Sequence, residues 1–141
     1  MREFIWFLDP LARASFEAAA RGHHAFFTSS FELLGGTWMY VLTLVVVVPT
    51  LGSRAVGILF TAEGTDAPIV HVFDPFWSPH RYSDGSLCMW HPHDPRRHRW
   101  LHTDGLPALI GHIQAHLVRE NWWRRMGEWL GPEAPHSKAV A

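Results

Sequence analysis

The longest apolar stretch of the chain is the feature that most constrains its fold. Residues 38–48 read WMYVLTLVVVV, eleven positions without a charge. A membrane-spanning helix requires about 20 apolar residues, so this stretch is too short to be one. Its many β-branched residues favour a buried strand instead. Because the run is apolar on both faces, at least one face must be covered by another layer. We therefore expect a soluble protein built on a sheet.

Two further strand-like runs follow, at residues 55–61 and 69–73. The breaks between the three runs are short and contain Pro49, Gly52, Gly64 and Pro68. Strands joined by short turns of this composition are typical of an antiparallel meander. The sequence therefore predicts one antiparallel sheet of consecutive strands.

Helices are predicted on both sides of these strands. Asp9 followed by Pro10 resembles a helix start, and the Ala-rich residues 11–20 favour a helix. A second helix is predicted over residues 106–123, where apolar residues recur on one face. Thr103 or Asp104 is its expected cap. The order helix, strands, long loop, helix is that of an α+β domain, and without repeats or linkers we expect residues 1–141 to form a single domain.

Overall composition narrows the functional class. The formal net charge is -1, which gives no reason to expect nucleic acid or a membrane as partner. The chain has no Gly-rich phosphate loop, and no cofactor is expected. Its single cysteine cannot form an internal disulfide, so a cytoplasmic location is the simpler interpretation.

That cysteine, Cys88, lies in the irregular, Pro-rich segment of residues 74–100, where a long loop often carries function. A free cysteine often only fills space in a core. Alternatively, Cys88 could ligate zinc together with the histidines that follow it, although structural zinc sites normally draw on two well-separated ligand pairs and the chain has no other cysteine. Those histidines are His91, His93, His98 and His102. Nothing in the spacing alone separates these two interpretations.

Two reactive roles also compete for Cys88. A Cys–His hydrolase needs a thiolate, and neither a helix start nor an oxyanion motif follows the cysteine. An acyl carrier accepts an acyl group as a thioester and passes it to an amine. It needs an exposed thiol on a rigid loop and a donor for the oxyanion, but no strongly acidified cysteine. His91, His93 and Asp94 are candidates for handling protons beside the thiol, and Asp94 could equally cap a turn.

His112 and His116 lie one helical turn apart on the predicted second helix, and this spacing suits either a pair of metal ligands or a solvated helix face.

The segment SPHRYSDGSLC, residues 78–88, resembles the active-site segment of ubiquitin-conjugating enzymes. Pro79, Tyr82, Gly85 and Cys88 have the mutual spacings of that family. Trp100 resembles the loop tryptophan that precedes the family's next helix. The resemblance covers most of the chain and implies that family's α+β fold: an N-terminal helix, an antiparallel β-meander, a long active-site loop and a C-terminal helix.

The same resemblance implies roles for these residues. Cys88 becomes the acyl carrier, with Tyr82 and Gly85 supporting its loop. Two positions depart from the family: Ser78 replaces its histidine, and His80 replaces the asparagine credited with supporting the oxyanion. We expect His80 to donate a hydrogen bond in that role.

The stretch DGSLCMWHP and the ending WWRRMGEWLGPEAPH resemble a compact bacterial branch of the family, found in CBASS anti-phage operons. Glu133 and His136 belong to this ending, and a tail that folds back would bring them to the cysteine. The resemblance implies that the cargo is the C-terminus of a cGAS-like nucleotidyltransferase (CD-NTase). A separate activating enzyme and a homodimer are left open. Two rival functions are also left open: an inactive docking module of the same fold and a zinc-binding structural protein.

Overall fold

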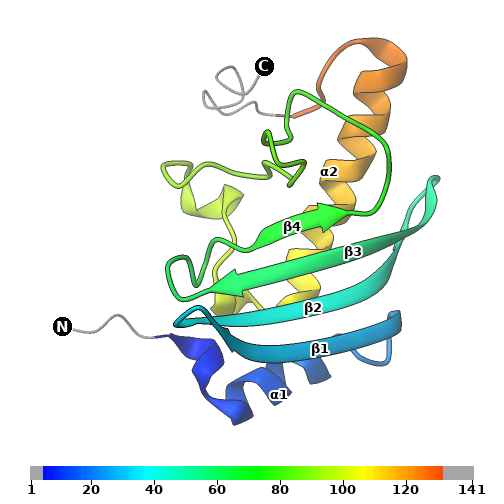
Figure 1. Cartoon of the computed structure of the whole chain (residues 1–141). Coiled ribbons are helices and arrows are strands. Elements are labelled where there is room, and N and C mark those ends of the chain that lie inside the picture. The colour runs from blue at the N-terminus through cyan, green and yellow to red at the C-terminus, as the bar shows by residue number, and fades with distance from the viewer. Residues whose placement is uncertain (1–4, 132–141) are drawn as a thin grey trace.

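The computed structural model describes residues 5–131, which form one antiparallel sheet and two α-helices (Figure 1). The elements are, in order, η1 (Trp6–Leu8), α1 (Pro10–Ala18), β1 (Ala25–Leu34), β2 (Thr37–Val48), β3 (Gly52–Thr61), β4 (Ile69–Val72), η2 (Arg96–His98), η3 (His102–Asp104) and α2 (Leu106–Met126). The strands pair in sequence order, β1-β2-β3-β4. This confirms the predicted α+β class and the antiparallel meander.

Strand β1 was missed in the sequence, which predicted only three strands. It pairs with β2 through a register that places Phe31 opposite Tyr40 and Glu32 opposite Met39. The strand reads AFFTSSFELL and contains no long apolar run, because β1 is an edge strand with many exposed residues. Polar residues alternate with Phe31 and Leu33, and this weak period of two is the signal that could have revealed the strand.

The two α-helices begin much as predicted. The Asp9 carboxylate accepts a hydrogen bond from the Leu11 N–H at 2.9 Å, and Pro10 occupies the first helical position. Helix α2 begins at Leu106, but neither predicted cap acts there. Gly105 is the N-cap, and the Asp104 carboxylate instead accepts from the Leu101 N–H at 2.9 Å.

The helices cover one face of the sheet. Alternate residues of β2 are buried, beginning with Tyr40 and continuing through Leu42 and Leu44 to Val48. At one end, the rings of Trp6 and Phe16 pack against Tyr40 and Phe60. Along the rest of that face the buried residues of α2 join the same core. None of the helices in residues 5–131 is long and apolar enough to cross a membrane.

The irregular segment that follows β4 extends beyond the edge of the sheet. Figure 1 shows it rising from the end of β4 and passing α2 before the chain returns to that helix. Strand β4 and helix α2 therefore flank the segment that contains Cys88.

Candidate active site

Cys88 lies at the end of a short hairpin attached to β4. Arg81 and Leu87 form an antiparallel bridge across this hairpin. The Leu87 N–H donates to the Val70 carbonyl of β4 at 2.9 Å, and the Cys88 N–H donates to the His80 carbonyl at 2.8 Å. These bonds fix the backbone that leads into Cys88.

The hairpin turn explains the glycine of the SPHRYSDGSLC segment. The Tyr82 N–H donates to the Ser86 carbonyl at 2.8 Å, and the Gly85 N–H donates to the Tyr82 carbonyl at 2.9 Å. Gly85 has φ +88°, which a residue with a side chain rarely adopts. The Asp84 carboxylate accepts from the Ser86 N–H and hydroxyl at 2.8 and 2.6 Å, and these hydrogen bonds lower the pKa of Asp84. The turn is therefore closed by its own backbone and by an ionised side chain.

The Cys88 side chain is nearly covered, since the residue is only 4% exposed. The expectation of an exposed thiol is therefore wrong. The cause is the packing of the hairpin on β4 together with the Tyr82 side chain, which hydrogen-bonds the sulfur. Burial raises the pKa of the Cys88 thiol, the hydrogen bond from Tyr82 opposes the rise, and the Asp94 carboxylate adds to it. A stable thiolate, as a Cys–His hydrolase requires, is disfavoured here.

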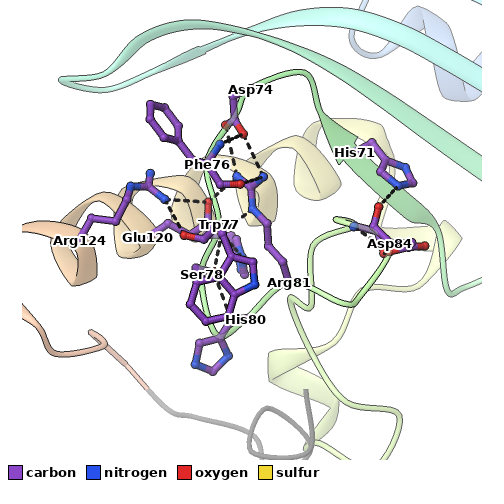
Figure 2. A network of polar contacts seen from close by, with 12 residues as sticks. His71, Asp74, Phe76, Trp77, Ser78, His80, Arg81, Asp84, Glu120 and Arg124 are labelled. Carbon is purple, nitrogen blue, oxygen red and sulfur yellow. Dashed lines mark hydrogen bonds and ion pairs between the residues drawn. The ribbon is translucent and has the colours of Figure 1, made fainter. Parts of the chain in front are cut away.

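His80 is also buried, at 4% exposure. Its N–H donates to the Ser78 hydroxyl at 3.1 Å, and its carbonyl accepts the Cys88 N–H. Its imidazole lies against the ring of Trp129, with 3.9 Å between ring centroids. Figure 2 shows the imidazole pointing away from Asp74. His80 and Cys88 are thus joined through the backbone, and the oxyanion role of the His80 side chain stays a prediction.

A buried ionic network lies beneath this hairpin (Figure 2). The Arg81 Nε and Nη2 donate to the two carboxylate oxygens of Glu120, each at 2.8 Å. Nη1 and Nη2 also donate to Asp74, at 2.9 and 3.2 Å, and Nη1 donates to the Phe76 carbonyl at 3.0 Å. These contacts use all five donors of the guanidinium. The Ser78 hydroxyl donates to Glu120 Oε2 at 2.6 Å, so Ser78 attaches the start of the segment to α2.

The charges in this network hold each other ionised. Burial alone would raise the pKa of Glu120, but the hydrogen bonds from Arg81 and from other donors lower it to about 2. Burial likewise opposes the charge of Arg81, yet Glu120 and Asp74 raise its pKa. A buried pair of this kind stabilises a fold only while both partners are present. The network therefore holds the segment before Cys88 to the helix.

No sequence motif predicted a role for Glu120, Arg81 or Asp74. A signal was available for Glu120, because it follows the core residue Leu117 by three positions and lies on the buried face of α2. A carboxylate on an apolar helix face requires a partner from elsewhere in the chain. The identity of that partner, Arg81, follows only from the tertiary structure.

His91, His93 and Asp94 form a compact turn of their own. The His91 N–H donates to the Asp94 carboxylate at 2.8 Å, and the Asp94 N–H donates to the His91 carbonyl at 2.9 Å. The His93 N–H donates to Nδ1 of His91 at 3.1 Å. Asp94 therefore caps this turn, as one interpretation of the sequence had it, while its charge also acts on Cys88. The proposed proton-handling roles of the two histidines stay predictions.

Trp100 lies in the core. It is 1% exposed and contacts the rings of Phe16 and Phe60, with 6.1 and 5.9 Å between centroids. Its Nε1 donates to the Gly105 carbonyl at 2.8 Å, at the start of α2. Trp100 therefore anchors the far end of the loop.

The histidines of the zinc alternative do not converge. Among residues 5–131, no group of three or more His, Cys, Asp or Glu side chains is placed to hold a metal ion. His102 instead contacts Asp66, with 2.8 Å between Nδ1 and Oδ1, and stacks on Trp6. His98 lies in η2.

The two histidines of α2 lie in different environments. The ring of His112 contacts Trp90, with 5.2 Å between centroids. His116 is 2% exposed, so the expectation of a solvated helix face is wrong for this residue. Its Nε2 lies 3.5 Å from Glu120 Oε2. His116 is buried because it shares the inner face of α2 with Glu120, one helical turn away.

A pocket of about 300 Å³ opens beside the hairpin. Its lining comes from the start of β4 and from residues 82–92, and most of it is apolar. Leu87 and Met89, the two chain neighbours of Cys88, both line it, and so does Tyr82. The Asp84 carboxylate is the one charged group of this lining. The pocket can hold an apolar side chain close to the thiol.

The chain after α2 turns back toward the site. Gly127, with φ +81°, ends the helix, and its N–H donates to the Trp123 carbonyl at 2.8 Å. Trp129 then reaches His80. Glu133 and His136, which were also predicted to support the site, lie outside the described residues.

Comparison with known proteins identifies one family. The family model described as Type II CBASS E2 protein matches residues 39–137, well over half of the chain. The match includes the hairpin, Cys88 and α2. No curated protein and no solved structure matches the chain.

Proposed function

The chain belongs to the Type II CBASS E2 proteins, and on that premise we propose that it carries an acyl group on Cys88 as a thioester and transfers it to an amine. Membership gives it an E2-like role in CBASS anti-phage defence, with protein partners from the same system. The proposed cargo is the C-terminus of a CD-NTase, and the proposed location is the cytoplasm. Activation of the cargo carboxylate is assigned to a partner protein. A homodimer stays a prediction.

One observation carries the proposal. The only cysteine of the chain ends a hairpin whose backbone is bonded to β4 on one side and to His80 on the other. A carrier thiol has to be held at a fixed place relative to the groups that stabilise the oxyanion. A cysteine that merely filled space would need no such hairpin.

The proposed reaction has two steps. First, the Cys88 thiol gives up its proton as its sulfur attacks the activated carbonyl of the cargo. The C–S bond forms, the bond from the carbonyl carbon to the activating group breaks, and that group leaves and takes up the proton that the thiol lost. Then an amine attacks the thioester carbonyl, a C–N bond forms, and the C–S bond breaks. The amine loses one proton, and the sulfur leaves as a thiol that has gained one. This chemistry does not need a strongly acidified cysteine, because the acyl group arrives already activated. The raised pKa of Cys88 means that its proton has to be removed as the sulfur attacks.

Each of the other site residues has a proposed part in these steps. His80 and the loop N–H groups would donate to the oxyanion of both tetrahedral intermediates. Tyr82 and Gly85 would hold the hairpin. His91, His93 or Asp94 would take the proton of the attacking amine. Trp100 would fix the end of the loop, while Glu133 and His136 would contribute from the tail.

Burial of Cys88 adds a requirement to this mechanism. Because the residue is 4% exposed, the cargo can reach the sulfur only after neighbouring side chains move. The same burial favours the rival function, a docking module that forms no covalent bond. The two functions make opposite predictions for a thioester.

The test is to incubate the protein with a CD-NTase and its activating partner, with ATP. We expect a heavier band on a non-reducing gel that disappears with a reducing agent. Cys88→Ser should give a band that resists the reductant, because an oxygen ester replaces the thioester, and Cys88→Ala should give none. Trp38→Ala, a surface change at the β1–β2 hairpin, is the matched control that should load normally. If the wild-type protein binds the activated cargo but forms no adduct, the acyl-carrier function is wrong and the docking module is favoured.

A further inference from the structure

The pocket beside the hairpin has no part in the reaction steps proposed above. Its volume is about 300 Å³, and its lining is mostly apolar. One water molecule takes up about 30 Å³ of the liquid, so the pocket has room for about ten waters. An apolar side chain that replaces such poorly bonded water gains affinity, because its surface is removed from water. The pocket therefore suits a large apolar side chain such as that of Leu or Phe.

The pocket and the thiol share one wall. Leu87 and Met89, on either side of Cys88 in the chain, both line the pocket. Tyr82 lines it too, and the Tyr82 side chain hydrogen-bonds the Cys88 sulfur. An extended peptide advances about 3.3 Å per residue, so about three residues span the distance from the sulfur to the pocket. A chain that ends at Cys88 can therefore place one of its last side chains in the pocket.

The other walls come from rigid parts of the molecule. Pro68 precedes Ile69, the first residue of β4, and both line the pocket. Pro92 lines it on the side of the hairpin, and both prolines have a fixed φ angle. The Leu87 N–H bonds the hairpin to the Val70 carbonyl of β4. A ligand therefore has little of this pocket left to order when it binds.

Asp84 is the one charged residue of the lining. Its carboxylate accepts from the Ser86 N–H and hydroxyl, and these hydrogen bonds lower the pKa of Asp84, so the group is ionised at neutral pH. Nε2 of His71 lies 3.3 Å from the Asp84 carbonyl oxygen, which links the turn to β4 (Figure 2). A fixed negative charge beside an apolar pocket favours a ligand that carries a positive charge next to an apolar group.

We propose that this pocket binds an apolar side chain from the last few residues of the cargo, and that a neighbouring basic residue of the cargo pairs with Asp84. This inference rests on the proposed function, in which the carboxyl end of a protein reaches Cys88. It adds the kind of sequence that this end should have. The pocket would then select the cargo by its last residues and hold them beside the thiol before the reaction.

The test uses short peptide thioesters of Gly and Ser, whose carbonyl is already activated, so that no activating enzyme is needed. One Leu is placed at each of the last positions in turn, and loading of Cys88 is followed by intact mass spectrometry. At its preferred position Leu should lower the peptide concentration at half-maximal rate by about tenfold to a hundredfold. An Arg beside this Leu should lower it by about twofold to fivefold more. Peptides in which Leu gains nothing at any position would overturn the inference.

Two variants assign these gains to the pocket. Ile69→Ala shortens an apolar wall and should reduce the gain from Leu by about threefold to tenfold, without changing the loading of the Gly and Ser peptide. Asp84→Asn keeps the oxygen that accepts from Ser86 but removes the charge, so it should abolish only the gain from Arg. Val47→Ala is the matched control, since Val47 is an exposed apolar residue of β2 outside the pocket lining. Equal losses in Ile69→Ala and Val47→Ala would contradict the proposed site.

A binding measurement separates failure of this inference from failure of the proposed function. The same peptides with a carboxylate in place of the thioester cannot load Cys88, and the NMR signal of the Met89 methyl group reports on the pocket. We expect this signal to shift with the Leu and Arg peptide, while the Met126 methyl signal stays in place. A Met89 shift without any thioester from the activated peptides would support the pocket and contradict the acyl-carrier function. Equal loading by all peptides without a Met89 shift would support that function and overturn the inference.

Discussion

Helices α1 and α2 each place a buried glutamate against another part of the molecule, and the two sites are built differently. Glu17 of α1 accepts the Tyr40 hydroxyl at 2.7 Å and the Arg21 Nη2 at 2.7 Å. The Arg21 side chain is 52% exposed, so one side of this pair faces water. Glu120 of α2 is 0% exposed, and the Arg81 side chain that pairs with it is 3% exposed. The second site is closed to solvent.

The difference reflects what each glutamate has to hold. Glu17 contacts a strand, β2, whose backbone already has ladder hydrogen bonds on both edges. Glu120 contacts the segment between β4 and the hairpin, which belongs to no strand or helix. Such a segment has to find its fixed position through side chains. An ionic network is therefore needed at the active site, whereas in the scaffold the bonds of Glu17 only supplement the ladder hydrogen bonds of the sheet.

The largest expected effect follows from removing the charge of Glu120. Glu120→Gln should lower the free energy of unfolding by about 3–5 kcal/mol, because it leaves the buried Arg81 partly unpaired. Glu17→Gln should cost only about 1–2 kcal/mol, because Arg21 can turn to water. Urea unfolding of the two variants, followed by circular dichroism, measures both values. Equal losses would show that the closed and open sites contribute alike.

The second-largest expected effect is the loss of stability at acid pH, which should differ between the Glu120 site and the Glu17 site. The pKa of Glu120 falls from its ordinary 4.5 to about 2 in the folded protein. Its stabilisation is therefore complete above about pH 4.5 and is lost as the pH falls toward 2, by on the order of 3 kcal/mol. Burial also lowers the pKa of His116, so the unfolded chain takes up that proton first, below about pH 6.5. Both groups make stability fall with falling pH.

Urea midpoints at a series of pH values from 7 to 2 test this expectation. Glu120→Gln should lose most of the decline below pH 4.5 and keep the decline that begins near 6.5. The pKa of Glu17 is also lowered, by bonds that overcome its burial, so Glu17→Gln should flatten the same range less. A wild-type curve that is flat below pH 4.5 would contradict the assigned state of Glu120.

Much of the scaffold could be predicted because its signals are local. The apolar run of residues 38–48 predicted β2, observed as Thr37–Val48, and the apolar spacing from Leu106 predicted α2. The edge strand β1 was missed because an edge needs few apolar residues. The cap of α2 was misplaced because Gly105 caps with its backbone alone.

The candidate site likewise has features that could be predicted from the sequence and features that could not. The family resemblance of residues 78–88 was enough to predict that Gly85 supports the loop before Cys88, and Gly85 lies in the hairpin turn. Spacing could not predict that Cys88 is covered, because burial depends on how the hairpin packs against β4. Nor could it predict that Arg81 pairs with Glu120, 39 positions away. The contact of Trp129 with His80 likewise depends on a chain reversal after a long helix.

The smallest expected effect on stability comes from removing one of two buried hydroxyl groups. It separates the roles of the two glutamate sites most selectively. Tyr40→Phe removes the donor to Glu17, and Ser78→Ala removes the donor to Glu120 at 2.6 Å. Each substitution keeps the rest of the side chain, so each should cost about 1–2 kcal/mol. In Tyr40→Phe the ring still stacks on Phe60, so the sheet should keep its geometry.

The two variants should differ in activity although they match in stability. The Ser78 hydroxyl also accepts the His80 N–H at 3.1 Å, so Ser78→Ala frees the backbone of the proposed oxyanion donor. Single-turnover transfer to lysine, measured where both variants are fully folded, should be slower for Ser78→Ala by about tenfold and unchanged for Tyr40→Phe. Equal rates would mean that the network beneath the hairpin stabilises the fold without aligning the site. A slower Tyr40→Phe would mean that the scaffold transmits its distortions to Cys88, and the distinction between the two glutamates would then no longer hold.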